Sequence, residues 1–412
     1  MLVIAGIVLF CYGLAPLAGA LAKRYSWFRF RSRFSELRLH PIMDSRAYWQ
    51  MEAGRQAGGA QAGGAPMGGA FRFIGELESL SDEPALWVRG EGLLVPVSLK
   101  NAETYLLPAQ SGEGIPETSD PGEEAPEKIR WEKIAALAEG TKVFVGGKMA
   151  LQDGRWCFVS TKESPSVVIF YDGPDHSLAT KAIWAGRHRG EYFNPITPYA
   201  LIIGALCLLF VAAAYLPRPA FRPTVLVSVV ALFVPLFPLV PPGLLFTVAY
   251  RRLTWRSRML RAYSDLAKLP LRYFAEEGCG RQRRSGPRRK AGDSLLRERR
   301  ALPNGELYGF ACSAKLPPEV HEGKIPMLIP EITELGEGES WHIFGAMRPS
   351  DLLPFRPKDP FATFGVLPGN PRSFALRCAA KAYALETVAW LMMLAGIALN
   401  VFFLRLVLSV LL

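Results

Sequence analysis

The sequence has few of the residues from which metal and catalytic sites are usually built. Its 412 residues include six cysteines and five histidines. No C-x-x-C pair occurs, so a zinc ribbon is excluded and a disulfide framework has no support. The H-E-x-x-H motif of zinc proteases and the G-x-S-x-G elbow of serine hydrolases are also missing. We therefore predict no catalytic, cofactor-binding or metal site, and we favour a role other than that of an enzyme.

Two segments offer weak alternatives to this conclusion. Asp172, Asp175, His176 and His188 cluster in the sequence and could bind a metal ion, but a solvated turn followed by a helix start is favoured. Glycine pairs in residues 58–69 invite a phosphate-loop interpretation. No predicted strand precedes them and no Gly-Lys-Ser/Thr follows, so a flexible linker is favoured.

Long apolar runs are abundant. Apolar residues make up 50% of the chain and the mean hydropathy is +0.14. A helix needs about 20 apolar residues to cross a bilayer. Four segments qualify as transmembrane helices, namely 1–22, 198–216, 224–250 and 386–412.

The third of these segments contains four prolines, Pro235, Pro238, Pro241 and Pro242. Proline removes a backbone donor and clashes with the preceding turn. We therefore predict a kinked or broken span whose freed carbonyls are satisfied by neighbouring helices. A re-entrant hairpin is the alternative.

The net charge of +11 is concentrated after the first and third apolar segments. A secretory signal peptide carries its basic residues before the apolar run, whereas here they follow it. Under the positive-inside rule, this arrangement places both termini outside and both soluble portions in the cytoplasm. We expect the plasma (inner) membrane.

Parts of the chain are written twice. Lys23-Arg24-Tyr25-Ser26-Trp27 is matched by Arg251-Arg252-Leu253-Thr254-Trp255. A second block pairs Glu139, Gly140, Gly147 and Met149 with Glu337, Gly338, Gly345 and Met347. Repeats of this kind indicate architecture. We assign the second block a structural role, glycine for backbone geometry and methionine for core filling; a shared functional role is the alternative.

This duplication predicts a membrane α + β fold, in which four transmembrane helices carry two tandem cytoplasmic domains resembling small β-barrels or sandwiches. The first copy has a basic juxtamembrane helix at 23–52, a Gly/Ala linker at 53–70 and a β domain at 71–197, with a disordered acidic insertion at about 110–128. The second has a basic amphipathic helix at 251–277, a polybasic linker at 278–301 and a β domain at 302–385.

Basic and aromatic residues beside the spans predict contact with the membrane surface. The interface candidates are Trp27, Arg29, Arg31, Arg33, Trp255, Arg256, Arg258 and Arg261. The polybasic linker could bind nucleic acid, but beside a cytoplasmic membrane face we favour anionic lipid. Its candidates are Arg283, Arg284, Arg288, Arg289 and Lys290.

Three short sequences suggest a family. They are the block Leu137–Met149, the Asp153-Gly154 turn and Tyr192–Pro195 before the second span. Together with the order span, β domain, span, they resemble the membrane domain of mitochondrial GIDE-type E3 ubiquitin ligases. The chain lacks the paired Cys and His ligands of a RING. The resemblance therefore implies a partner-binding β domain but no ligase activity.

The sequence favours a non-catalytic scaffold or partner-binding module. We expect it to present two β domains at the cytoplasmic membrane face, with an unidentified cytoplasmic protein and anionic lipid headgroups as partners. One alternative is a transporter-like or lipid-handling protein, although polar residues are scarce in the spans. The other is a membrane enzyme related to GIDE-type ligases but lacking the RING.

Overall fold

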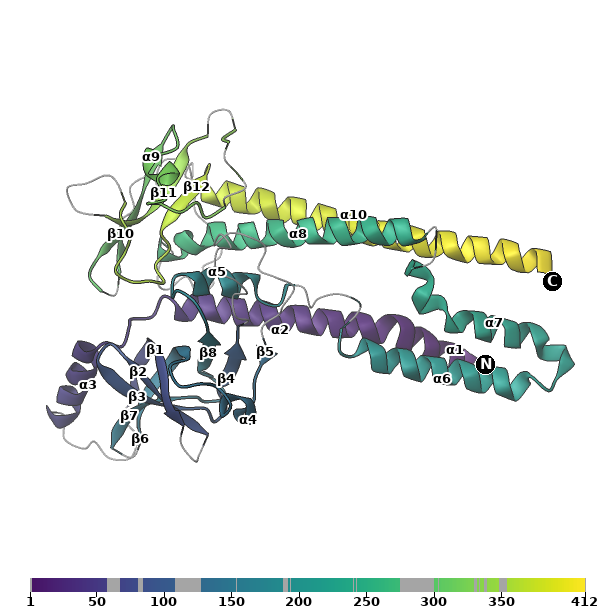
Figure 1. The fold of residues 1–412 in the computed structure, drawn as a ribbon, viewed down its shortest axis with the longest axis horizontal. Coiled ribbons are helices and arrows are strands. Elements are labelled where there is room, and N and C mark those ends of the chain that lie inside the picture. Colours follow the sequence, from purple (N-terminus) through teal and green to yellow (C-terminus); the bar gives the residue numbers. More distant parts are fainter. Residues whose placement is uncertain are drawn as a thin grey trace, which may run out of the picture. The chain divides into compact units, whose positions relative to one another are not determined.

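The computed structural model combines long helices with two β-sheets (Figure 1). It describes residues 2–57, 67–80, 84–107, 127–152, 154–187, 192, 194–239, 241, 243–274, 300–302, 304–329, 332, 334–336, 339–347 and 354–411. The chain divides into two compact units. Unit 1 contains residues 1–28, 186–264 and 376–412, and unit 2 contains residues 29–185 and 265–375. The mixed α and β composition agrees with the predicted class.

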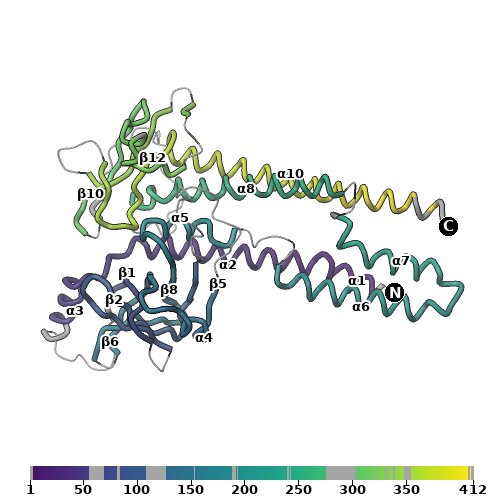
Figure 2. Tube along the Cα trace, in the orientation of Figure 1, coloured from purple at the N-terminus to yellow at the C-terminus, as the bar shows by residue number. Residues whose placement is uncertain are grey.

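Unit 1 is built of apolar helices. The elements that enter it are α1 (Leu2–Leu9), the π-helical turn η1 (Phe10–Leu14), α2 (Ala15–Leu37), α6 (Thr197–Tyr215), η3 (Pro219–Phe221), α7 (Arg222–Leu232), η4 (Val234–Leu239), α8 (Gly243–Leu271) and α10 (Pro371–Leu411). We call α1, η1 and the part of α2 in unit 1 the first helical run. In unit 1, α6 lies beside this run, where it contacts α1 and η1, and α8 lies beside α10 (Figures 1 and 2). Among the described residues, three helices are long and apolar enough to cross a membrane, at Val3–Leu37, Thr197–Tyr215 and Pro371–Leu406.

The third predicted span is interrupted. α7 ends at Leu232, a 3₁₀ segment covers Val234–Leu239, and α8 begins at Gly243. The prolines account for the break because they cannot donate to the helical ladder. The predicted break is therefore confirmed. With 11 residues, α7 is only about 16 Å long at 1.5 Å per residue, too short to cross a bilayer alone.

The larger sheet of unit 2 contains a closed barrel. Its strands are β1 (Met67–Leu80), β2 (Ala85–Gly90), β3 (Leu93–Ser98), β4 (Glu103–Leu106), β5 (Glu127–Lys128), β6 (Lys142–Gln152), β7 (Arg155–Val159) and β8 (Val167–Tyr171). The order is β1-β2-β3-β7-β6-β8-β4-β5, and β1 also pairs with β6. Strands β1, β2, β3, β7 and β6 therefore form a ring, closed by a parallel contact at Val97 and Phe158. This order resembles that of an OB-type barrel, and fold alone assigns no function.

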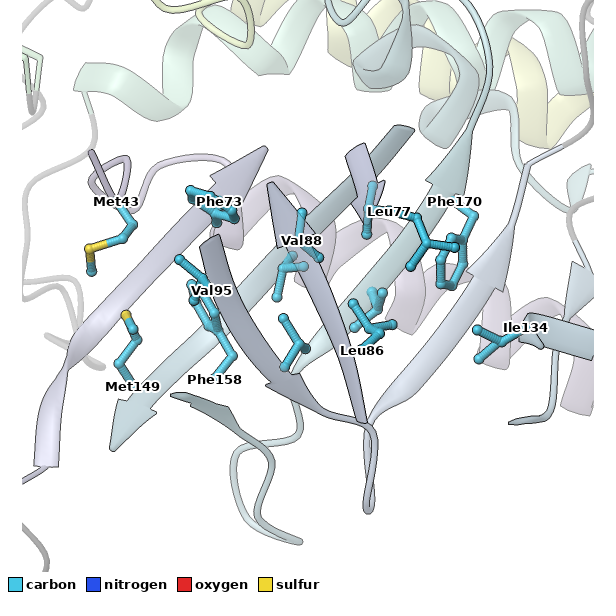
Figure 3. Close-up of a cluster of buried hydrophobic side chains, with 14 of the residues drawn as sticks. Met43, Phe73, Leu77, Leu86, Val88, Val95, Ile134, Met149, Phe158 and Phe170 are labelled. Carbon is cyan, nitrogen blue, oxygen red and sulfur yellow. The ribbon is translucent and has the colours of Figure 1, made fainter. Parts of the chain in front are cut away.

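The barrel interior is a continuous apolar core (Figure 3). Phe73 and Leu77 on β1 face Val88 on β2 and Phe158 on β7, all of them buried. β2 alternates between buried and less buried positions, as expected for a strand with one face on a core. A hairpin at Gly154 joins β6 to β7, and the positive φ of 76° at this position suits glycine.

The end of α2 covers this sheet in unit 2. Phe30 packs on Tyr105 with ring centroids 4.5 Å apart, and Phe34 packs on Phe144 at 5.4 Å. Leu37 lies over Gly146, where an added Cβ would come within 3.0 Å of it. The spacing of four and three residues places these side chains on one helix face. The predicted basic helix at 23–52 is therefore two helices, because α2 ends at Leu37 and α3 spans Ser45–Ala57.

The second sheet is smaller and open. Its strands are β9 (Arg300–Ala301), β10 (Leu307–Ser313), β11 (Trp341–Met347) and β12 (Gly365–Pro368), in the order β12-β11-β10-β9. Within the described part of 302–375, no strands correspond to β2, β3 and β7. The prediction of a second barrel or sandwich is thus corrected to a four-stranded sheet. One face packs on Ile325, Val320 and the short helix α9 (Pro318–His321).

The two sheets share a central arrangement. β6 lies between β1 and β8, and β11 lies between β10 and β12, with antiparallel pairing throughout. Phe144 pairs with Ile169, and His342 pairs with Leu367. Each residue of the second pair lies 198 positions after its counterpart, the same offset that separates Gly147 from Gly345. A helix follows each third strand, α5 (Ser177–Trp184) and α10.

Several predicted loops lie largely outside the described residues. This applies to 58–66 of the Gly/Ala linker, 110–126 of the acidic insertion and 278–299 of the polybasic linker. The linker's two ends differ from the prediction, because α3 extends to Ala57 and β1 begins at Met67. The last residues of the predicted acidic insertion form the short strand β5, and those of the polybasic linker form the short strand β9.

Candidate functional site

A fully buried arginine follows α2 in unit 2. The Arg38 side chain is 1% exposed. Its Nη1 donates to the Phe361 carbonyl (3.1 Å) and to Thr363 Oγ1 (3.0 Å), and its Nη2 donates to the Leu269 carbonyl (3.3 Å). The guanidinium carbon lies 5.4 Å from the centre of the Tyr273 ring. Neutral acceptors and an aromatic face therefore hold this charge away from water.

A second buried arginine, Arg72 on β1, has a carboxylate partner. Its Nη2 forms an ion pair with Asp359, and the two side chains are 1% and 3% exposed. Nε donates to the His40 carbonyl at 2.8 Å. Asp359 also accepts a bond from the Phe361 amide (2.9 Å). The pair is thus desolvated and bonded on several sides, the condition under which a buried ion pair is tolerated.

Aromatic side chains fill the space around the two arginines. The Phe361 ring lies 5.5 Å from the Arg72 guanidinium and 5.3 Å from the Phe144 ring. Tyr273 donates to the Phe361 carbonyl (3.3 Å), and Tyr308 donates to the Thr363 carbonyl (2.8 Å). Burial raises the pKa of both tyrosines, so each remains a neutral donor.

We call Arg38, Arg72, Asp359, Phe361 and Thr363 the arginine seam. Arg38 and Arg72 belong to the first half of the chain, and their side-chain partners Asp359 and Thr363 come from the segment before β12. The seam therefore binds the barrel and the open sheet together within unit 2. Most of its polar groups are hydrogen-bonded, while Arg38 Nε and Arg72 Nη1 are buried without a partner among the described residues. Groups so enclosed suit a structural joint better than a reaction centre.

Unit 1 contains a second group of arginines, which we call the Glu386 cluster: Arg24, Arg187, Arg258, Arg261 and Glu386. Arg24 Nη1 lies 2.8 Å from Glu386 Oε1, and Arg261 forms an ion pair with the other carboxylate oxygen. Burial lowers the pKa of Arg258 to about 10. Burial, together with Arg24, Arg187 and Arg258, lowers the pKa of Arg261 to about 10. Arg258 and Arg261 therefore remain charged at neutral pH.

The predicted membrane-interface residues fall into two sets. Arg29, Trp255 and Arg256 are exposed. The others are engaged within the chain: Trp27 is buried against Gly186, Arg31 donates to the Ala185 carbonyl (2.7 Å), Arg33 pairs with Glu103 (2.7 Å), and Arg258 and Arg261 join the Glu386 cluster. Trp27, a predicted interface residue, is thus buried within the chain. Tyr25 and Phe28 are the exposed aromatics of this helical segment.

The first helical run of unit 1 has a proline-induced opening. Pro16 has no N–H for the Tyr12 carbonyl, and the π-helical turn Phe10–Leu14 lies just before it. The Tyr192 hydroxyl donates to the Tyr12 carbonyl (2.5 Å), and Asn194 Nδ2 donates to the Pro16 carbonyl (2.8 Å). The segment before α6 therefore satisfies carbonyls of the first run.

The interrupted third segment uses the same chemistry. Pro241 has no N–H for the Phe237 carbonyl, which accepts a bond from Asn400 Nδ2 on α10 (2.5 Å). Thr247 Oγ1 donates to the Pro238 carbonyl (2.5 Å). The prediction that neighbouring helices satisfy the freed carbonyls is confirmed at Phe237.

The repeat residues lie at turns and tight contacts. Gly140 has a φ of 81° and donates to the Leu77 carbonyl (2.8 Å). A Cβ at Gly147 would collide with Ser166, and one at Gly345 would lie 2.7 Å from the Phe355 carbonyl. Met149 is in the barrel core, Met347 is buried in the second sheet, and Glu139 is exposed. Glu337 and Gly338 are outside the described residues, as are the lipid candidates Arg283, Arg284, Arg288, Arg289 and Lys290.

The acidic turn after β8 is held by local bonds. Asp175 Oδ1 lies 3.0 Å from Lys142 Nζ and accepts a bond from the Tyr171 hydroxyl (3.0 Å). Asp172 Oδ1 accepts from the Gly173 amide (2.7 Å). His188 lies outside the described residues, and no group of three or more metal-ligand side chains occurs among those that are described. The favoured interpretation, a turn before a helix, agrees with this geometry.

Sequence reasoning did not single out the seam residues or Glu386, although Arg258 and Arg261 of the Glu386 cluster were among the predicted interface residues. Arg72 interrupts apolar neighbours on a strand, and Glu386 stands alone at the start of an apolar run; isolated charges in such places are a usable signal. Arg38 carries no comparable signal, since it is one of many arginines after the first span.

Comparison of the chain with family models, with curated proteins and with solved structures finds no match.

Proposed function

We propose that the chain is an integral membrane protein with four spans, and that its two β portions arose by duplication. They stand at the cytoplasmic face of the plasma (inner) membrane, with both termini outside. There they act as a non-catalytic scaffold that binds a cytoplasmic protein. The resemblance to GIDE-type membrane domains implies the same role for the β domain.

The arginine seam is the observation that carries this proposal. A scaffold needs surfaces held in a constant relation to one another, since ordering them on binding costs free energy. Asp359 and Arg72 are almost completely buried and bonded to each other, so separating the two sheets would expose unpaired charges. The barrel and the open sheet therefore act as one rigid platform within unit 2.

The fourth span is supported by the way the broken segment is completed. α7 and the start of α8 together supply the length that α7 lacks. Asn400 and Thr247 satisfy the carbonyls released at the break, which a bilayer interior requires. Duplication is supported by the shared strand order and by the common offset of 198 residues between the central strands.

Affinity purification of the full chain in mild detergent, followed by mass spectrometry, tests the scaffold role. The wild-type chain and the Asp359→Asn variant are compared, with Asp172→Asn, a variant of an exposed turn residue, as the matched control. We expect a specific cytoplasmic partner with wild type and control, and its loss when the seam is disrupted.

Alkaline carbonate extraction of each variant shows whether it remains in the membrane. Recovery of no specific partner with the wild-type chain would refute the scaffold role. A partner retained equally by the seam variant would refute the claim that the joined sheets form its binding surface.

A further inference from the structure

The Glu386 cluster joins three helical segments of unit 1 and one loop. Arg24 comes from α2, Arg258 and Arg261 from α8, and Glu386 from α10. Arg187 follows Gly186, whose backbone packs under the Trp27 ring. A further link, from Ser257 Oγ to the Ala382 carbonyl (2.9 Å), holds α8 against α10 beside the cluster. The arginines are thus positioned by packed helices rather than by free side chains.

The cluster has more positive than negative charge. Arg24 and Arg261 share the single carboxylate of Glu386, which leaves one positive charge unbalanced between them. Arg187 and Arg258 are close enough to lower the pKa of Arg261. Both have interactions of their own, so the excess charge is counted on Arg24 and Arg261 alone. Mutual repulsion among these guanidinium groups is relieved by an anion.

The cluster is also open to a ligand. The side chains of Arg24, Arg261 and Glu386 are 40%, 22% and 21% exposed. Within the described structure, Arg261 Nε has no hydrogen-bond partner, although it is shielded from water. Guanidinium groups present paired donors that match the oxygens of a phosphate. The chemistry of the site therefore fits a phosphate monoanion or diester.

Apolar and aromatic side chains flank the cluster along the same helices. Leu21 on α2, Val248 on α8 and Leu391 on α10 are exposed. Tyr25, Trp255 and Tyr383 are exposed close to the cluster in sequence, and the Arg261 guanidinium lies 5.8 Å from the Tyr383 ring. Exposed aromatics at the end of apolar helical stretches are typical of headgroup depth.

We propose that the Glu386 cluster binds the phosphate of an anionic phospholipid headgroup. This inference rests on the proposed membrane function, which places the cluster at the cytoplasmic interface. Arg24, Arg258 and Arg261 hold the phosphate oxygens, and the exposed apolar residues contact the acyl chains. The free phosphate ion shares the headgroup's chemistry but not its acyl chains.

Lipid binding to the purified full chain in detergent tests the proposal. Short-chain phosphatidylglycerol, phosphatidylcholine of equal chain length and inorganic phosphate are titrated separately, with native mass spectrometry as the readout. The loss of one charge-assisted contact in Arg261→Gln should weaken phosphatidylglycerol binding about tenfold. The exposed Arg252→Gln on the same helix is the matched control and should bind nearly as wild type does.

A variant with the opposite effect keeps the test independent of misfolding. Glu386→Gln removes the internal competitor for Arg24 and Arg261, so phosphatidylglycerol should bind more tightly, by about threefold or more. Equal phosphatidylglycerol affinity in wild type, Arg261→Gln and Glu386→Gln would overturn the proposal. Inorganic phosphate binding as tightly as phosphatidylglycerol would overturn the assignment to lipid and leave a site for a free anion.

Carbonate extraction separates this inference from the proposed function. A chain that is extracted from membranes refutes the four-span arrangement, whatever its affinity for phosphate. A chain that resists extraction but binds phosphatidylglycerol without dependence on Arg261 refutes only the cluster's role.

Discussion

Two groups of arginines in this protein each surround a single carboxylate, but they differ in how far they are buried. The seam of unit 2 has two arginines and Asp359; the Glu386 cluster has Arg24 and Arg261 sharing one glutamate. In the seam, Arg72 and Asp359 are 1% and 3% exposed, whereas Arg24, Arg261 and Glu386 of the cluster are 40%, 22% and 21% exposed. Each group has two arginines beside one carboxylate, and the cluster also has Arg187 and Arg258 nearby. The clearest difference between the two groups is therefore how far they are buried.

An arginine–carboxylate group acts as a structural joint when it is buried and as a binding surface when it is exposed. A desolvated ion pair is costly to form and more costly to break, so it holds its elements together. A half-exposed group contributes little to stability because water and salt compete with it. Its charge remains available to a ligand, which is the property that we assign to the Glu386 cluster.

Removing the seam's carboxylate should have the largest effect. Asp359→Asn leaves the Arg72 guanidinium buried without a counter-charge, and about 3–5 kcal/mol of unfolding free energy should be lost. Denaturant unfolding of the full chain in detergent micelles, followed by tryptophan fluorescence, measures this. A loss no greater than that of Glu386→Gln would contradict the division into joint and surface.

Removing the seam's other arginine should cost less. Arg38→Met keeps much of the side-chain volume but leaves three neutral acceptors, including the Phe361 and Leu269 carbonyls, without their donor. Each unsatisfied acceptor is partly relieved by relaxation, and we expect a total loss of about 1–3 kcal/mol. The same unfolding measurement applies. A variant more stable than wild type would show that Arg38 is a tolerated defect rather than part of the joint.

Lowering the pH should destabilise unit 2, the unit that contains the seam. His342 stacks beside Phe310 and Phe344 in the second sheet, and burial lowers its pKa. Because the folded state favours the neutral ring, stability is full above the unfolded pKa of about 6.5 and falls as pH drops through the folded value. We expect the melting temperature of unit 2 to fall between about pH 7 and pH 5.

His342→Phe, which places in β11 the residue found at position 144 in β6, should reduce this acid sensitivity. His40 has a pKa lowered in the same direction by burial, so part of the dependence should remain. Scanning calorimetry at several pH values compares the variants. An unchanged pH profile in His342→Phe would show that this ring does not couple to folding.

The smallest stability effect should come from the cluster. Glu386→Gln removes a partly exposed carboxylate, and the unfolding free energy should change by less than about 1 kcal/mol. High salt should shrink even this difference, because the Debye length falls to about 3 Å at 1 M. Parallel unfolding curves at low and high salt provide the measurement. A salt-resistant loss of several kcal/mol would make this cluster a second joint.

Local patterns predicted much of the fold. Apolar length predicted four spans, and three of them correspond to described helices long enough to cross a membrane. The prolines at 235–242 predicted the break between α7 and α8. The repeat containing Gly147 and Gly345 located the central strands of both sheets. These features depend on residues close together in the sequence, because hydrophobic periodicity and proline directly determine local backbone structure.

Long-range contacts were beyond such patterns. The barrel closes through a parallel contact between Val97 and Phe158, and Arg38 finds acceptors 231 to 325 residues away. Trp27 and Trp255 occupy matching positions in the repeat, yet only Trp27 is covered, because Gly186 packs under its ring. A sequence repeat therefore predicts similar local structure in both copies, but not which residues pack against each copy.

The opening at Pro16 has a consequence for the order of events during synthesis. The hydroxyl that serves the Tyr12 carbonyl belongs to Tyr192, 180 residues further along the chain. At about 5–20 residues per second, a ribosome needs about 10–40 s to make that stretch. During this interval the Tyr12 carbonyl lacks the hydrogen bond that Tyr192 later donates. The first helical run is completed only when the segment before α6 arrives, so the two are expected to mature as a pair.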